Sequence, residues 1–212
     1  STDGIFFMTT MLVTGGCGFI GRNLAQHLVG DGWSVTIVDD MSNGHLELLD
    51  GLDFRTIPDA GLYDSFLLAA ADGNTFTDRT VIVIQDDFAN PRVLSLVASG
   101  EFDVVFHQAA VPRVSYSVEH PAETTEVNIT KTVGLFEACR NAVDRVVWAS
   151  SSSVYGGADV LPTSESEPKD PKSPYAWQKS AVEDVAKMFG DLYDLDRVCL
   201  RYFNVFGPGQ YG

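Results

Sequence analysis

Short runs of β-branched and other apolar residues recur along the chain and alternate with segments of helical periodicity. The runs that predict strands are Met11–Thr14, Val35–Val38, Val81–Ile84, Val104–Phe106, Val146–Trp148 and Val198–Leu200. They are almost continuously apolar, which is typical of strands that are covered on both faces. The alternation predicts an α/β fold built on a doubly wound parallel sheet of the Rossmann type.

Helical periodicity separates these strands. Ile20, Leu24 and Leu28 recur at four-residue spacing between the first two strands, and glycines follow them as stop signals. Residues 123–141 and 175–193 predict two further helices.

Two segments are predicted to be irregular. Residues 44–79 are too long for a simple connection, so a helical excursion is expected around Tyr63–Ala71. Residues 156–173 are rich in Pro, Ser, Glu and Lys, and they predict a surface loop before the helix at 175–193.

The composition narrows the class of protein. Of the 212 residues, 45% are hydrophobic, which suffices for an ordinary globular core. The formal net charge of −15 argues against a nucleic-acid partner, because no basic stripe is available to neutralise phosphates. The same charge argues against an anionic membrane surface. A well-solvated exterior explains the acidity best.

Cysteine usage and hydropathy indicate a cytoplasmic protein. Cys17, Cys139 and Cys199 are far apart and form no C-x-x-C pair, which predicts reduced thiols rather than a disulfide framework or a zinc site. No metal site is expected. The sequence has no apolar stretch of about 18 residues and no basic region before its N-terminal apolar run, so neither a membrane span nor secretion is expected.

A glycine cluster, Gly15-Gly16-Cys17-Gly18-Phe19-Ile20-Gly21, follows the first strand and opens the first helix. Glycines in this context permit a tight turn and let backbone N–H groups approach a pyrophosphate. Asp39 ends the second strand, where a carboxylate can bind an adenosine ribose and repel a 2′-phosphate. Because no Arg occupies residues 38–44, NAD is favoured over NADP. FAD, or a turn that only packs strand against helix, are the alternatives.

Tyr175 and Lys179 are four residues apart and therefore share one helix face. A phenol with a pKa near 10 works as a base near neutrality only if its pKa falls by about three units. An ammonium about 4 Å away supplies energy of that order. The serine-rich run Ala149–Gly156 ends the fifth predicted strand, at the edge where parallel sheets bind ligands. The alternatives are a Tyr–Lys surface pair and a serine-rich turn.

Taken together, these residues resemble the extended short-chain dehydrogenase/reductase family, specifically its nucleotide-sugar (UDP-hexose) 4-epimerases. The resemblance also includes Ser42-Asn43-Gly44, Asp87-Phe88, His107–Val111, Asn128 and Leu200–Gly209. It implies an NAD-binding Rossmann domain over residues 8–212, with the family's smaller C-terminal substrate domain largely absent. A fragment or an unsupplied remainder is expected, with a lost lid as the alternative, and residues 1–7 are a candidate cloning remnant.

The resemblance also implies roles for individual residues. Ser151, Tyr175 and Lys179 are implied to be catalytic, with Tyr175 as the base and Lys179 as the group that tunes it. NAD contacts are implied for Gly15, Gly18, Phe19, Ile20, Gly21, Asp39, Asp40, Ser42, Asn43, Gly44, Asp87, Phe88, Gln108, Ala109, Ala110, Val111, Asn128, Ala149, Tyr175, Lys179, Tyr202 and Phe203. Contacts to a nucleotide-sugar substrate are implied for Arg113, Ser151, Ser152, Tyr175 and Asn204.

The residues beside Ser151 separate reactions within this family. Its 4,6-dehydratases carry an Asp-Glu pair at the positions of Ser152 and Ser153, and its decarboxylases usually carry Glu at the second position. This chain has neither carboxylate. The resemblance therefore implies reversible oxidation at C4: Tyr175 removes the C4 hydroxyl proton while a hydride passes to NAD, and the 4-keto sugar turns and takes the hydride back on its other face.

Two alternatives to an epimerase stay open, namely an oxidoreductase with net NAD(H) turnover and a non-catalytic NAD-binding module. The sugar also stays open. Pro112 stands where many UDP-galactose epimerases have Lys, and Val111-Pro112-Arg113 looks more like epimerases that act on N-acetylhexosamine or uronic acid nucleotides. Homologues usually dimerise through the helices that correspond to 123–141 and 175–193, so the resemblance implies a homodimer.

Overall fold

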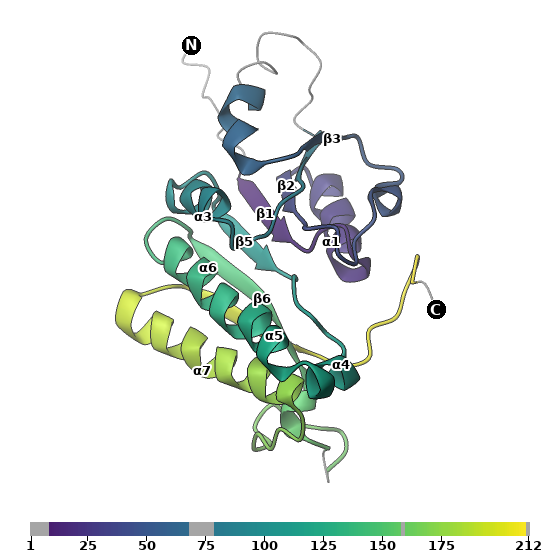
Figure 1. Cartoon of the computed structure of the whole chain (residues 1–212), viewed down its shortest axis with the longest axis vertical. Helices are drawn as coiled ribbons and strands as arrows, with labels where there is room; N and C mark the ends of the chain where they lie inside the picture. Colours follow the sequence, from purple (N-terminus) through teal and green to yellow (C-terminus); the bar gives the residue numbers. More distant parts are fainter. Residues whose placement is uncertain (1–8, 68–78, 158–159, 211–212) are drawn as a thin grey trace.

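Parallel strands form the centre of the computed structural model, which describes residues 9–67, 79–157 and 160–210 (Figure 1). The strands are β1 (Thr10–Thr14), β2 (Ser34–Val38), β3 (Phe54–Ile57), β4 (Val81–Ile84), β5 (Val104–His107), β6 (Arg145–Ser151) and β7 (Arg197–Tyr202). Their order in the sheet is β3-β4-β2-β1-β5-β6-β7, and every neighbouring pair is parallel. The predicted doubly wound parallel sheet is confirmed.

Helices connect these strands. They are α1 (Phe19–Gly30), α3 (Pro91–Ala98), α4 (Val114–Glu119), α5 (Pro121–Thr125), α6 (Thr132–Cys139) and α7 (Pro174–Tyr193). Short 3-10 turns occupy η1 (Leu46–Leu49), η2 (Ala60–Leu62) and η4 (Ser152–Tyr155), and a π-helical turn occupies η3 (Glu126–Lys131). Among the described residues, no helix combines the length and apolarity that crossing a bilayer requires.

The sheet separates two apolar cores because successive side chains of a strand point to opposite faces. On β1, Leu12 packs into a core that includes residues of α3, α6 and α7, whereas Met11 and Val13 pack into a second core with residues of α1. Figure 1 shows α5, α6 and α7 beside one another, and α5 and α6 both contact α7. Helices therefore cover both faces, as the near-continuous apolar strands predicted.

The predicted elements are confirmed with small shifts of boundary. Each of the six predicted strands is present, and the helix predicted at 123–141 is built from α5, η3 and α6. Of the expected helical excursion, residues 63–67 are helical and residues 68–71 lie outside the described residues, as does the candidate remnant at 1–7. The described residues of 156–173 form the expected loop.

The sequence did not predict β3, α3 and α4. In β3, Arg55 and Thr56 are exposed between the partly buried Phe54 and the buried Ile57, so the strand lacks a continuous apolar run. A local signal for α3 was present, because Asn90 caps the helix by accepting a hydrogen bond from the Arg92 amide at 2.9 Å, and Pro91 is its first residue.

The strand order reverses between β1 and β5, which are neighbours in the sheet: β2 to β4 are added on one side of β1, and β5 to β7 on the other. This is the topological switch point at which open parallel sheets bind ligands beyond their carboxyl ends. The backbones that follow the two strands approach closely there. A Cβ atom on Gly15, whose φ is +68°, would lie 2.8 Å from the Ala109 nitrogen. The sheet topology thus brings the glycine cluster against the segment after β5.

Two glycines of α1 give a matched test of this packing. A Cβ atom on Gly21 would lie 2.2 Å from the Gly15 carbonyl oxygen, whereas one on Gly30 would meet nothing within 4 Å. We expect Gly21→Ala to lower the free energy of unfolding by about 2 kcal/mol or more. Gly30→Ala should leave it unchanged or raise it by up to about 1 kcal/mol. Urea denaturation measures both, and a Gly21→Ala protein as stable as Gly30→Ala would contradict the packing.

Candidate active site

The glycine cluster forms the turn from β1 into α1. Gly18 is the N-cap of α1, its backbone is extended, and no side chain caps this helix end. A Cβ atom on Gly18 would meet only the Gly15 carbonyl, at 3.4 Å. The first turn of a helix leaves backbone N–H groups without intrahelical partners, so this turn offers an open anion cradle.

Asp39 lies at the end of β2 and is 7% exposed. One carboxylate oxygen accepts a hydrogen bond from the Cys17 amide and the other from the Met41 amide, each at 2.9 Å. Burial raises the pKa of Asp39, and these two hydrogen bonds oppose the rise. The carboxylate therefore holds the glycine turn to the 40–44 loop, and its remaining lone pairs stay available to a ligand diol.

The 40–44 loop closes over Asp39. A Cβ atom on Gly44 would lie 2.7 Å from the Asp39 Oδ1 atom, so only glycine fits there. Asp40, Ser42 and Asn43 are exposed, and Asp40 accepts a hydrogen bond from the Ser42 amide at 2.9 Å.

Asp87 and Phe88, the residues expected beside an adenine, have different surroundings. Asp87 forms an ion pair with Lys131, a residue that the sequence did not single out. Phe88 is buried, and the centre of its ring lies 4.8 Å from the centre of the His107 ring. Within this pair Asp87 is the partly exposed residue, and Phe88 belongs to the core.

The segment after β5 is held by Asn128. The Asn128 side chain accepts a hydrogen bond from the Val111 amide at 2.8 Å and donates one to the Val111 carbonyl at 3.1 Å. It also donates to the Gln178 side chain of α7 at 2.8 Å. Asn128 is buried in the π-helical turn η3, a distortion that is frequent at functional sites. Asn128 thereby links residues 109–111 to α7.

The three residues expected to be catalytic meet at the end of β6. Tyr175 is buried, and burial raises its pKa while the neighbouring Ser151 side chain opposes the rise. The Ser151 oxygen accepts hydrogen bonds from the Ser153 amide at 3.1 Å and the Ser153 hydroxyl at 2.9 Å. The sequence did not assign a role to Ser153, although it lies in the serine run.

Lys179 is buried one helical turn after Tyr175. Its ammonium donates to the Ala149 carbonyl of β6 at 2.8 Å and lies 5.8 Å from the centre of the Tyr175 ring. Burial lowers the pKa of Lys179 to about 8. We expected this ammonium to lower the pKa of Tyr175 by about three units. That prediction is wrong for the chain by itself, because burial dominates at Tyr175 and the ammonium is directed at Ala149.

A buried polar chain beneath the site was not predicted. His107 lies between two hydroxyl groups, with its Nδ1 atom 2.7 Å from that of Thr14 and its Nε2 atom 3.0 Å from that of Thr132. Burial lowers the pKa of His107 to about 3, and the nearby Lys179 adds to the effect. The imidazole is therefore neutral at physiological pH and joins β1, β5 and α6.

The remaining site residues lie near the chain's C-terminal segment. Burial raises the pKa of Tyr202, and the neighbouring Gln108 side chain opposes the rise. Arg113, Phe203 and Asn204 are exposed, and Ser152 is partly buried. After β7 the segment returns toward α1 (Figure 1), where the Arg22 guanidinium and the Asn23 amide donate to the Pro208 carbonyl at 2.7 and 3.3 Å.

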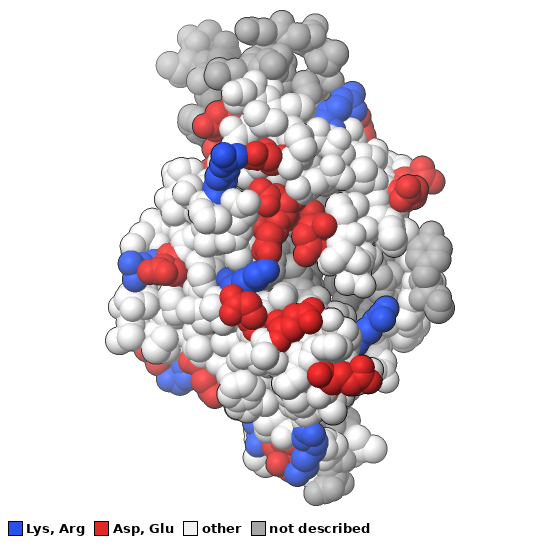
Figure 2. All heavy atoms as spheres, in the orientation of Figure 1, with Lys and Arg blue, Asp and Glu red and all other residues white. Residues whose placement is uncertain are grey.

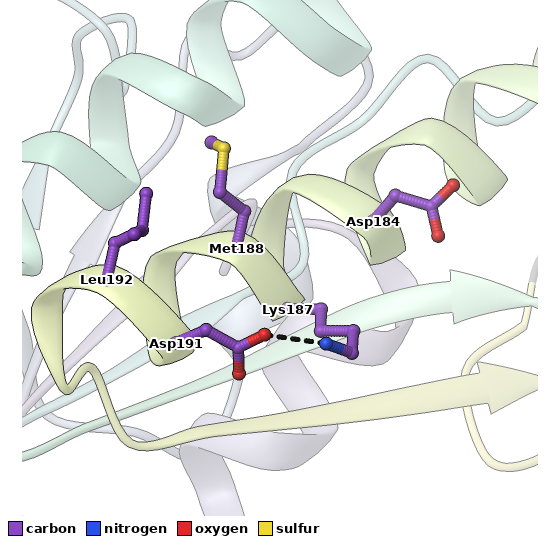
Figure 3. A pocket seen from close by; sticks show the side chains of 5 residues that line it. All are labelled: Asp184, Lys187, Met188, Asp191 and Leu192. Carbon is purple, nitrogen blue, oxygen red and sulfur yellow. Dashed lines mark hydrogen bonds and ion pairs between the residues drawn. The ribbon is translucent and has the colours of Figure 1, made fainter.

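Two other surface features lie outside this group. Acidic side chains gather near the middle of the face in Figure 2, and the basic side chains drawn there form no continuous stripe among the described residues. A hollow on α7 is lined by Asp184, Lys187, Met188, Asp191 and Leu192 (Figure 3). It begins nine residues after Tyr175, about 14 Å along the helix, so it is separate from the site.

In the part of the chain that the structure describes, no three His, Cys, Asp or Glu side chains gather as metal ligands would.

The family described as "NAD dependent epimerase/dehydratase family" matches residues 11–212. The UDP-glucose 4-epimerase of Mycolicibacterium smegmatis is 37% identical over 201 residues, which cover 94% of this chain and 57% of that protein. The chain thus spans little more than half the length of this curated relative.

Solved structures of nucleotide-sugar epimerases are also similar to this chain. The UDP-N-acetylglucosamine 4-epimerase of Methanobrevibacter ruminantium, in complex with UDP-N-acetylmuramic acid, superposes with a TM-score of 0.78 at 35% identity, over 96% of this chain and 57% of that one. The UDP-glucose 4-epimerase of Thermus thermophilus, in complex with NAD, has a TM-score of 0.73 at 32% identity, over 96% of this chain and 58% of that one.

The buried His107 gives a pH test of the polar chain. Its pKa is about 3 in the folded protein, against 6.5 ordinarily. Between these values the unfolded chain binds a proton that the folded chain does not, so stability falls as the pH drops from about 6.5 toward 3. The loss approaches about 1.4 kcal/mol per pH unit.

Urea denaturation between pH 7 and pH 4 should show a shallower fall for His107→Asn than for the wild type. The exposed His27 supplies the control, because His27→Asn should follow the wild-type slope. Equal slopes for His107→Asn and the wild type would show that His107 titrates normally.

Proposed function

The chain belongs to the NAD dependent epimerase/dehydratase family, and on that premise we propose that it inverts C4 of a nucleotide-activated sugar with bound NAD through a transient 4-keto sugar. The observation that carries this proposal is the meeting of Ser151, Tyr175 and Lys179 at the end of β6. Ser151 opposes the burial-driven rise in the pKa of Tyr175, and the Lys179 ammonium binds the Ala149 carbonyl two residues before Ser151. This group lies at the carboxyl ends of the strands, where ligands of parallel sheets bind.

NAD fits the residues around the switch point. The glycine turn is a cradle that a Cβ atom on Gly15 or Gly21 would fill. The pyrophosphate would lie at the uncapped start of α1, and Asp39 would hold the adenosine ribose. When bound, NAD⁺ would accept and return a hydride and would add a positive charge to the site. Residues 8–212 are proposed as one NAD-binding domain.

The chain's own residues would move the proton. Tyr175 would take the proton of the C4 hydroxyl as general base and return it to the inverted alcohol, and Ser151 would share the hydrogen bond. Because burial raises the pKa of Tyr175, its phenolate requires nearby positive charge. Lys179 retains its charge below about pH 8 and is the residue that would supply it.

The serine run supports inversion without elimination. Ser152 and Ser153 occupy the positions at which the family's dehydratases carry an acid and a base, and the Ser153 hydroxyl donates to Ser151 instead. No side-chain carboxylate stands at these positions to assist loss of water. Oxidation at C4 followed by return of the hydride remains as the chemistry of the site.

The substrate is proposed as a UDP-sugar of the glucose/galactose, N-acetylhexosamine or uronate type. The relatives are named for UDP-glucose and UDP-N-acetylglucosamine, which supports the class and leaves the sugar open. Arg113, exposed at the N-cap of α4, and Asn204 are proposed as contacts to it.

Assembly and location are proposals of the same kind. The exposed Trp177, Met188 and Leu192 of α7 support a homodimer through this helix. In Figure 3, Met188 and Leu192 project from one side of α7, and Lys187 and Asp191 form an ion pair on another. The three free cysteines support a cytoplasmic protein.

The preference for NAD⁺ over NADP⁺ tests the proposed NAD site. The 212-residue chain should bind NAD⁺ at least about tenfold more tightly than NADP⁺, because the Asp39 carboxylate repels a 2′-phosphate. Asp39→Asn should remove most of that preference in titration calorimetry. Asp31→Asn, which removes an exposed carboxylate beyond α1, should keep it. Equal affinity of the wild-type chain for both dinucleotides would contradict the assignment of Asp39, and binding of neither would contradict the NAD site.

Turnover of nucleotide sugars tests the proposed roles of Ser151, Tyr175 and Lys179. UDP-glucose, UDP-N-acetylglucosamine and UDP-glucuronate should be offered to this chain and to the longest protein that contains it. One of them should yield a C4-inverted product, and Tyr175→Phe should slow that conversion by about 10²-fold or more without loss of NAD. Tyr193→Phe, at the exposed end of α7, serves as control. No inverted product with NAD bound would refute epimerisation, and a steady absorbance change at 340 nm would indicate an oxidoreductase instead.

A further inference from the structure

A largely buried carboxylate lies behind the site and has no role in the chemistry described above. Glu183 is on α7, its side chain is 10% exposed, and it is the next residue after Tyr175 and Lys179 at four-residue spacing. Residues four apart lie on one face of a helix, so all three point toward the sheet side of α7.

Glu183 accepts hydrogen bonds from residues on two strands, including a 3.7 Å contact from the Cys199 Sγ atom of β7. Its Oε1 atom accepts hydrogen bonds from the Ser150 hydroxyl of β6 at 2.7 Å and from the Arg201 Nε atom of β7 at 2.9 Å. Its Oε2 atom accepts from the Arg201 Nη2 atom at 2.7 Å. Burial raises the pKa of Glu183, but the hydrogen bonds from Arg201 and Ser150 outweigh it and hold the pKa below its usual value. A bidentate, charge-assisted pair of this kind fixes geometry as well as contributing energy.

Arg201 extends the cluster beyond the sheet. Its Nη1 atom donates to the Tyr155 hydroxyl at 2.8 Å and to the Glu165 carbonyl at 3.2 Å. The turn η4, which starts beside Ser151, and the loop before α7 are thereby tied to the same guanidinium. On the other side of Glu183, Lys169 lies 3.8 Å away and donates to the Ser180 carbonyl of α7 at 3.2 Å.

Each anchor of the cluster adjoins a residue of the proposed site. Ser150 precedes Ser151, and Arg201 precedes Tyr202. Lys179 donates to the Ala149 carbonyl while Glu183 accepts from Ser150, so two successive turns of α7 hold two successive residues of β6. These contacts limit sliding and rotation of α7 over the strand that carries Ser151.

We propose that Glu183 is a positioning residue, whose carboxylate locks α7 to β6 and β7 and so fixes where the Tyr175 hydroxyl and the Lys179 ammonium lie relative to Ser151. The role rests on the proposed function. A catalytic group displaced by about 1 Å costs about 10²-fold in rate, so the effect on turnover is large although Glu183 touches no reacting atom.

Glu183→Gln keeps the shape of the side chain and removes its charge. In this variant kcat should fall about 10- to 100-fold, with KM and bound NAD within about threefold of the wild type. The pH profile of kcat should move by about half a unit or more, because it reports the pKa values of Tyr175 and Lys179 in the complex. A residue that only stabilises the fold would leave that profile in place.

Ser150→Ala is the second variant, since it keeps the Glu183–Arg201 pair and removes only the bond to β6; it should lower kcat in the same direction. Asp184→Asn is the matched control, because Asp184 is the next residue on α7, is exposed and pairs only with Lys169 among the described residues. A wild-type kcat and pH profile in folded Glu183→Gln overturns the proposal. If Glu183→Gln does not fold, an unchanged kcat in Ser150→Ala overturns it. An equal loss in Asp184→Asn also overturns it.

Amide hydrogen exchange gives a readout that does not depend on turnover. In Glu183→Gln, exchange at residues 149–153 and 174–183 should be faster than in the wild type, and α1 should keep its protection. If the wild-type protein shows no inversion, the proposed function fails, and exchange alone judges the positioning role. Unchanged protection of both segments would then overturn it.

Discussion

The hydrogen bond from the buried Lys179 ammonium to the Ala149 carbonyl is the contact on which the rest of the site depends. A charge that is 5% exposed is tolerated only when it is well paired, and burial has already lowered its pKa to about 8. The bond seats α7 on the end of β6. Tyr175 is one turn earlier on the same helix face, which places its side chain in the neighbourhood of Ser151.

This contact lies on β6, which is the neighbour of β5, and the topological switch point lies between β5 and β1. Between β1 and β5 the two backbones are so close that Gly15 has no room for a side chain against Ala109. Asn128 then holds the segment after β5 to α7 through Val111 and Gln178. The proposed NAD site and the Ser151–Tyr175–Lys179 group are therefore linked by close packing and buried hydrogen bonds. A substitution in either of these two sites should therefore alter the other.

The local parts of this arrangement could be predicted from the sequence, and the long-range parts could not. Apolar runs predict the strands, and four-residue spacing places Tyr175 and Lys179 together, because both are properties of neighbouring residues. The direction of the Tyr175 pKa shift depends on burial by distant elements, so the predicted fall is wrong for the chain by itself. The His107 chain and the Glu183–Arg201 cluster join residues from separate elements, so no spacing in the sequence signals them.

In the proposed reaction a hydride leaves C4 and returns to it within one bound complex. The most direct measurement follows a UDP-sugar labelled with deuterium at C4 through turnover, by mass spectrometry and NMR of the product. The inverted product should keep its deuterium at C4, with no NADH released. Replacement of the label by solvent hydrogen, or its appearance in free NADH, would contradict oxidation and return at one carbon.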